Sequence, residues 1–326
     1  GGGGGGGTTG GGGLAGDNVQ FLRWPVQRTG RTDQNSVVTD VTSHKLASRQ
    51  MRDWSSSGVV TWAHEENHGT NNGIALSRAC DDPPNSRRLC NGMCGACQLG
   101  LYVLNGRAFT LGTSPVDANS MAPLIPYVPT AMRYSRFRTY VTNPCAQCNT
   151  RPVQLFDEWV SYVVGARSAI AHVQAGRWRP SRECFNSNVP NCGRQDAADG
   201  AIEFAAYCVS TVAYLKEAYP QWSASADGRK LLEFTAWHLR ETFAATNAAL
   251  TCTGPVANAD CKTLFSGFRA ERMLAQWRGA DGARYRQWLS RWWGDDYVRR
   301  VVMATPDSSG GSGGVRPPPP PPPLPP

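Results

Sequence analysis

Residues His64 to His68 read H-E-E-N-H, and this H-E-x-x-H pattern constrains the chain more than any other segment. Residues four apart lie on one face of a helix, one turn above each other, so a helix here brings both imidazoles to the same side. Two imidazoles in that arrangement can bind one Zn²⁺, and Glu65 then lies beside the metal. The chain has only five histidines, and two of them are used here. The fold must therefore present this helix face to a further ligand.

Composition indicates a globular domain with a light charge load. Hydrophobic residues make up 40% of the 326 residues and charged residues 18%, which is enough apolar surface for a sizeable core. The net charge is +8, but the arginines are scattered and form no long basic run. We therefore predict a solvated basic surface and no nucleic-acid partner. No run of about 18 apolar residues occurs, so no transmembrane segment is predicted.

Eleven cysteines indicate an oxidising compartment. Cys184 and Cys192 enclose a short polar loop, as do Cys252 and Cys261, and this spacing suits local disulfides. The sequence thus predicts a secreted, periplasmic or cell-envelope protein. The odd count leaves one thiol over, and Cys208, inside an apolar helical pattern, is our candidate for a buried free cysteine.

The remaining cysteines leave three interpretations open. Disulfides are favoured, for example between Cys80 and Cys90. Cys90, Cys94 and Cys97 also have the C-x₃-C-x₂-C spacing of an iron–sulfur ligand set. The two C-x-x-C pairs at 94–97 and 145–148 can alternatively form a structural zinc site.

We expect an α+β fold with flexible tails at both ends. Residues 1–15 form a Gly-rich linker, and residues 305–326 form a Ser/Gly and polyproline tail. The linker is expected to be a tether that permits attachment to the cell envelope after removal of an export signal. One domain at 16–304 has a mixed α/β subregion, about 16–150, and a predominantly helical subregion, about 151–304.

Local patterns predict the elements of both subregions. In the first, we expect strands at 19–24 and 36–41, a helix from 59 through the motif that ends at Gly69, a turn at 71–73, and a hairpin of 99–104 with 107–111. In the second, apolar residues at helical spacing predict helices from 152 onward and at 198–218, 227–248, 264–277 and 284–302.

A catalytic zinc needs a third protein ligand besides the two histidines. The H-E-x-x-H-x-x-G-x-x-H continuation is absent, because Asn71 and Ile74 stand at its Gly and His positions. Glu158, paired with Asp157 near the start of an apolar helix, is the best candidate, because a buried carboxylate needs a partner such as Zn²⁺. Alternatively, this acidic pair only favours the helix N-terminus through the helix dipole. Glu203, on the next helix, is the second candidate for the ligand.

The motif, together with a helical carboxylate further on, resembles the zincin metallopeptidases, and among them the Glu-zincin branch. The resemblance implies a zincin-like catalytic domain and a secreted, zinc-dependent hydrolase that cleaves a peptide or protein substrate. It implies His64, His68 and Glu158 as the zinc ligands. Zinc would lower the pKa of its water to roughly 7, and Glu65 would take the proton as general base.

The oxyanion formed during hydrolysis needs a donor besides the metal. Tyr162 lies one helical turn after Glu158 on the same face and is the predicted donor, with Tyr140 as a second candidate. Core or rim packing is the alternative role for either side chain.

A function of a different class stays open beside the enzyme. The chain can instead be a non-catalytic, disulfide-rich cell-surface binding or structural protein. Trp288, Trp292 and Trp293, interleaved with arginines, can form an aromatic binding surface, although the four-residue spacing of the first two favours core packing.

Overall fold

The computed structural model describes residues 13–30, 35–45, 56–79, 99–112, 115, 120–143, 151–175, 177, 197–251 and 269–305. Helices dominate this part of the chain, and one small antiparallel sheet accompanies them, which confirms the expected α+β fold. The helices are α1 (Ser36–His44), α2 (Ser56–Ala79), α4 (Ser135–Phe137), α5 (Leu155–Gln174), α7 (Ala197–Ala218), α8 (Pro220–Ser223), α9 (Ala226–Thr251), α11 (Arg269–Arg278), α12 (Ala283–Trp293) and α13 (Asp295–Tyr297). Short 3₁₀ helices span Ala122–Tyr127, Thr130–Met132, Pro152–Gln154 and Ala280–Gly282, and π-helical turns span Arg138–Thr142 and Val298–Val302.

The sheet has three antiparallel strands in the order β1 (Leu22–Arg23), β3 (Arg107–Leu111) and β2 (Leu99–Tyr102). The predicted hairpin is confirmed, and its turn places Leu104, Asn105 and Gly106 at positive φ. The strand predicted at 19–24 pairs only over its Leu22–Arg23 part.

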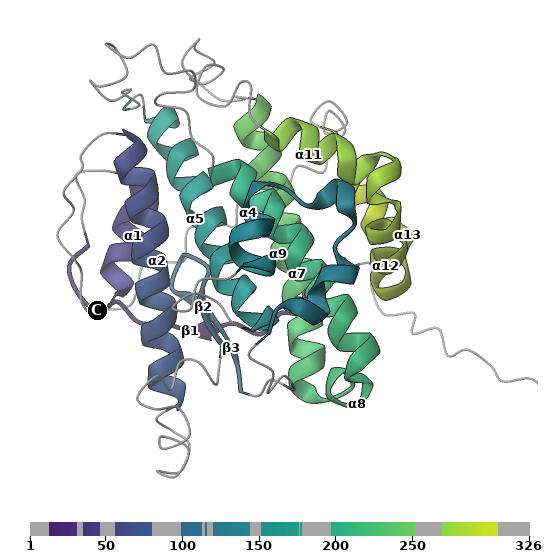
Figure 1. The fold of residues 1–326 in the computed structure, drawn as a ribbon. Coiled ribbons are helices and arrows are strands. Elements are labelled where there is room, and N and C mark those ends of the chain that lie inside the picture. The colour runs from purple at the N-terminus through teal and green to yellow at the C-terminus, as the bar shows by residue number, and fades with distance from the viewer. Residues whose placement is uncertain are drawn as a thin grey trace, which may run out of the picture.

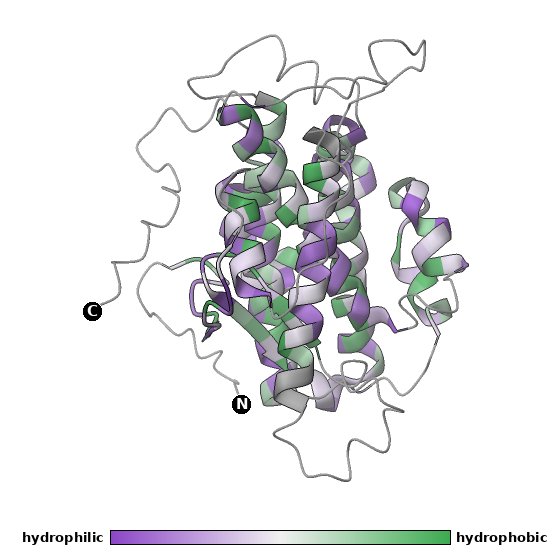
Figure 2. Ribbon diagram, turned by 90° about the vertical axis from the view of Figure 1, so that its left-hand side faces the viewer, coloured by the Kyte–Doolittle hydropathy of each residue, from purple (hydrophilic) through white to green (hydrophobic). Residues whose placement is uncertain are grey.

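The helices form a bundle in which α5 packs against α2, α7 and α9 (Figure 1). The side chains that pack between these helices are mostly apolar, and hydrophobic and hydrophilic stretches alternate along each helix (Figure 2). Trp159 of α5 is fully buried and donates its indole N–H to Thr242 of α9, 2.9 Å away. The α2–α5 contact brings the H-E-x-x-H segment against the helix that carries Glu158.

The strand predicted at 36–41 is wrong, because this segment forms α1. Asn35 caps the helix by accepting a hydrogen bond from the backbone N–H of Val38, at 3.0 Å. Val38 and Val41, three residues apart, are both fully buried in a cluster with residues of α2. Capping and one-sided burial therefore outweigh the strand preference of β-branched residues.

The helix end predicted at Gly69 is also wrong, as is the turn at 71–73, because α2 continues to Ala79. Gly69 instead allows a close approach: a Cβ there would lie 2.5 Å from Cε of Lys45. Lys45 passes this point and forms an ion pair with Glu66, at 2.8 Å. Asn71 is held inside the helix by tertiary contacts, because its Oδ1 accepts a hydrogen bond from the backbone N–H of Tyr102.

The predicted helices of the second half are confirmed in α5, α7 and α9. The prediction at 264–277 overlaps α11, and its first residues lie outside the described part. The helix predicted at 284–302 is interrupted at Gly294, which has φ 84° and separates α12 from α13. Trp288 is buried, and Trp292 and Trp293 pack against the same core, which favours the packing role over an aromatic binding surface.

Several sequence predictions fall outside the described residues. These are most of both tails and every cysteine except Cys208. The thiol of Cys208 is free and fully buried, as predicted, and burial raises its pKa well above the usual value. Within the described ranges, none of the helices has the length and apolar character needed to cross a bilayer.

Candidate metal centre

His64, His68 and Glu158 converge between α2 and α5. One ligand atom from each residue lies within 4.8 Å of the other two. The Nε2 atoms of the two histidines are 2.9 Å apart, and Oε2 of Glu158 lies 3.7 Å from that of His64 and 3.5 Å from that of His68. The structure thus brings together the three residues that the sequence analysis assigned to the metal.

These distances fit a small cation with two imidazole ligands and one carboxylate ligand. Zinc binds such atoms at roughly 2.0–2.2 Å, which in a tetrahedral site places ligand atoms roughly 3.3–3.5 Å apart. The observed separation of the two Nε2 atoms, 2.9 Å, is shorter than this range, and the separations from Oε2 of Glu158, 3.5 and 3.7 Å, lie at or above its upper end. The three side chains are only 13%, 21% and 14% exposed, so the site is shielded while solvent still reaches it.

One carboxylate oxygen of the cluster has only long contacts. Oε2 of Glu158 is buried and makes no hydrogen bond of ordinary length to the described residues; its neighbours are the imidazole Nε2 atoms of His64 and His68, at 3.7 and 3.5 Å. A buried carboxylate oxygen with only such contacts is costly, because they compensate poorly for its lost hydration. A cation between this oxygen and the two Nε2 atoms would remove that cost.

The outer ring nitrogens of the histidines are held by α5. Nδ1 of His68 lies 2.8 Å from Oδ2 of Asp157, and Asn71 donates to the other oxygen of that carboxylate at 2.5 Å. The ring of His64 donates to the backbone carbonyl of Ser161. Such contacts fix the imidazole tautomer and leave Nε2 as the metal-binding atom.

The two histidines have opposite pKa shifts. Burial lowers the pKa of His64 well below its usual value, and the neighbouring positive charges of His68 and Arg136 lower it further. Burial also acts to lower the pKa of His68, but the carboxylates of Asp157 and Glu158 outweigh it and raise that pKa well above the usual value. Negative charge is therefore concentrated on the α5 side of the site, where a cation would be stabilised.

The two glutamates inside the motif have different surroundings. Glu65, the predicted general base, has an exposed side chain on α2. Glu66 is 2% exposed and forms the ion pair with Lys45. Glu65 is thus in contact with solvent, whereas Glu66 anchors α2 to the end of α1.

Tyr162, the predicted oxyanion donor, lies beside the three candidate ligands. Its ring packs edge-on against the ring of His64, with the centroids 4.4 Å apart. Tyr140 interacts with the Tyr162 hydroxyl; burial raises the pKa of Tyr140 above its usual value, and the charge of Glu158 adds to the shift. Both predicted oxyanion donors therefore surround the same site.

Glu203, the second candidate for the third ligand, has other partners. Its Oε2 accepts a hydrogen bond from Nη1 of Arg136 at 3.0 Å, and its Oε1 accepts one from the hydroxyl of Tyr207 at 2.6 Å. Both carboxylate oxygens are thus occupied. Among the described residues, Glu158 is the carboxylate that groups with both histidines.

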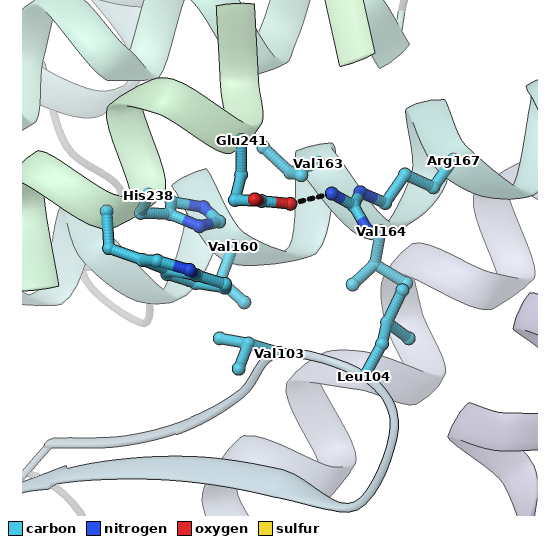
Figure 3. A pocket seen from close by; sticks show the side chains of 9 residues that line it. Val103, Leu104, Val160, Val163, Val164, Arg167, His238 and Glu241 are labelled. Carbon is cyan, nitrogen blue, oxygen red and sulfur yellow. Dashed lines mark hydrogen bonds and ion pairs between the residues drawn. The ribbon is translucent and has the colours of Figure 1, made fainter. Parts of the chain in front are cut away.

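A small cavity lies elsewhere in the bundle, between the β2–β3 turn, α5 and α9 (Figure 3). Arg167 and Glu241 form an ion pair at its edge, and His238 and several valines line it. Its volume is about 10 Å³, which is about the space that one water molecule needs. This cavity cannot hold a substrate.

Comparison of the chain with protein-family models, curated proteins and solved structures finds no match. The geometry of the site is therefore the basis for assigning a function.

The sequence patterns do not assign two residues of the site. They mark Asp157 only as part of an acidic pair, and they predict a turn at Asn71. The signal for Asp157 is its position next to Glu158, from which its carboxylate reaches Nδ1 of His68. Nothing local marks Asn71, because both of its partners are distant in sequence.

Proposed function

We propose that this protein is a zinc-dependent hydrolase, and specifically a secreted metallopeptidase. The observation that carries the proposal is the convergence of His64, His68 and Glu158, with the buried Oε2 of Glu158 3.5–3.7 Å from the two Nε2 atoms. A site with two histidines and one carboxylate that keeps access to solvent is the usual arrangement of catalytic rather than structural zinc. Secretion is supported by the cysteine content alone.

The residues around the ligands supply the remaining chemistry. Zinc supplies Lewis acidity, which makes water a nucleophile near neutral pH. Glu65 adjoins His64 in the chain and is exposed, so it can accept a proton from the attacking water and pass it to the leaving amine. Tyr162, against the His64 ring, donates a hydrogen bond to the developing oxyanion.

Metal analysis of the purified protein tests the zinc site. We expect about one zinc per chain, lost in His64→Ala, His68→Ala and Glu158→Gln. Glu271→Gln, an exposed carboxylate on α11, is the charge-matched control and should keep the metal. Protein that binds no zinc would overturn the proposal. Iron at the site would instead favour an oxygenase, because two histidines and one carboxylate also bind Fe(II).

A second experiment separates metal binding from catalysis. Glu65→Gln should keep its zinc but lose roughly 100-fold or more in hydrolysis of a quenched-fluorescent peptide library, because the general base is removed. The Glu271→Gln control should hydrolyse peptides like the wild type. Wild-type protein that binds zinc and cleaves no peptide in the library would support the non-catalytic alternative.

A further inference from the structure

Arg136, on α4, connects Tyr162 to a buried carboxylate. Its Nε donates a hydrogen bond to the Tyr162 hydroxyl oxygen at 3.0 Å, and its guanidinium carbon lies 4.7 Å from the centre of the Tyr162 ring. The side chain is 12% exposed. An arginine buried to this degree needs a negative partner, because its desolvation is costly.

Glu203 is that partner and holds Arg136 at two points. The backbone N–H of Arg136 donates to Oε1 at 2.6 Å, and Nη1 donates to Oε2 at 3.0 Å. Glu203 is fully buried, and Tyr207 also donates to it. The orientation of the guanidinium plane is therefore set by α7, and Nε is directed at Tyr162.

The Tyr162 ring is confined on its other sides. It stacks on Phe204, with centroids 5.2 Å apart and an angle of 19° between the planes. Gly200 leaves the space that the ring fills, because a Cβ at position 200 would lie 2.1 Å from Cδ1 of Tyr162. The ring position is thus fixed by packing, which leaves the direction of the hydroxyl proton to be set by hydrogen bonding.

We propose that Arg136 is a positioning residue that orients the Tyr162 hydroxyl toward the metal centre. An arginine only donates hydrogen bonds, so the Tyr162 oxygen must accept from it, and the Tyr162 proton is directed to a different acceptor. In the resting site the Tyr140 hydroxyl also donates to the Tyr162 oxygen, so the Tyr162 proton stays available for another acceptor. During hydrolysis the acceptor is the substrate oxyanion, and the positive charge of Arg136 makes the Tyr162 O–H a stronger donor. The role of Arg136 in hydrolysis rests on the proposed function, whereas its hydrogen bond to Tyr162 does not.

Arg136→Lys is the variant of choice. Lysine keeps a positive charge beside Glu203, so the buried carboxylate is not left unpaired. It lacks the planar fork that binds Glu203 and Tyr162 at once. If this variant does not fold, Arg136→Gln combined with Glu203→Gln removes both charges together. Tyr207→Phe is the matched control, because it removes a hydrogen bond to Glu203 without contacting the Tyr162 hydroxyl.

The geometry is tested without activity, by ¹⁹F NMR of metal-free protein with 3-fluorotyrosine at position 162. We expect Arg136→Lys to shift the resonance, and Tyr207→Phe to leave it in place. An unchanged resonance in Arg136→Lys, or equal shifts in both variants, would overturn the positioning role.

Kinetics of the zinc-loaded protein test the consequence. We expect Arg136→Lys to keep one zinc per chain and to lose roughly 10-fold or more in kcat, with KM nearly unchanged, because the contact acts in the transition state. In a Tyr162→Phe background the same substitution should cause no further loss. A full additional loss in that background would show that Arg136 acts by another route. Wild-type protein without zinc or activity would refute the proposed function, while the ¹⁹F result would still decide the positioning role.

Discussion

Gly69→Ala should destabilise the protein, although alanine is the better helix former. Gly69 lies inside α2, where replacement of glycine by alanine normally stabilises a helix by about 1 kcal/mol. Here the new Cβ would lie 2.5 Å from Cε and 2.7 Å from Nζ of Lys45. Those separations are too short for atoms in contact, so the Lys45 side chain must move.

Cε and Nζ are the flexible end of Lys45, but their shift disturbs the ion pair with Glu66, which is 2% exposed. Oε2 of Glu66 already has no hydrogen-bond partner among the described residues, so loss of the 2.8 Å contact would leave the whole carboxylate uncompensated. Complete loss of a buried pair costs about 3–5 kcal/mol, which is the upper limit for this shift. After the gain in helix propensity is subtracted, we expect a net loss of at most about 2–4 kcal/mol in the free energy of unfolding.

Urea unfolding followed by circular dichroism measures this change. The decisive control is Gly69→Ala in a Lys45→Ala/Glu66→Leu background. That background has neither the clashing atoms nor the ion pair, so the substitution should there stabilise the protein by about 1 kcal/mol. A Gly69→Ala variant that is as stable as the wild type, or the same loss in both backgrounds, would refute the reasoning.

Three further predictions concern the metal, pH and packing. Zinc at a free concentration 100 times its Kd should raise the free energy of unfolding by about 2.7 kcal/mol, seen as a higher Tm that Glu158→Gln abolishes; an unchanged wild-type Tm would contradict this. Burial, with the nearby charge of Arg167, lowers the pKa of His238 from 6.5 to about 3. The unfolded chain therefore binds a proton between these values and the folded protein does not, so stability falls as pH drops below 6.5. This costs roughly 2 kcal/mol by pH 5, and His238→Phe should flatten the loss in urea titrations; an equal loss in the variant would exclude His238 as its cause. Gly200→Ala should cost roughly 1–3 kcal/mol by overpacking against Tyr162 and should lower hydrolysis while zinc content stays at one per chain; wild-type stability would show that the ring moves freely.

The clustering of His64, His68 and Glu158 could be predicted because the signals for these residues are local. His64 and His68 share a helix face by spacing alone, and Glu158 is an acid at the start of an apolar helix. Tyr162 follows from Glu158 by one helical turn. In each case the residues lie on one helix, and their spacing in the sequence shows which of them share a face.

The supporting contacts could not be predicted because they join distant segments. Nothing in the sequence near Glu203 indicates that Arg136 binds it, so sequence patterns alone leave this buried acid as a second candidate for the ligand. The role of Gly69 depends in the same way on Lys45, which precedes α2 in the chain. The β-branched residues at 36–41 predict a strand. The segment forms a helix instead, because Asn35 caps it and its valines pack on α2.

The division of the ligands between two helices has a consequence for how the protein acquires its metal. Under the proposed function, α2 supplies two ligands and α5 the third, and Glu158 follows His68 by 90 positions. A nascent or unfolded chain therefore offers only a weak two-histidine site, and tight binding begins when α5 docks on α2. Metal uptake then reports docking of the two helices, and a bound ion closes a loop of that length, as a crosslink would.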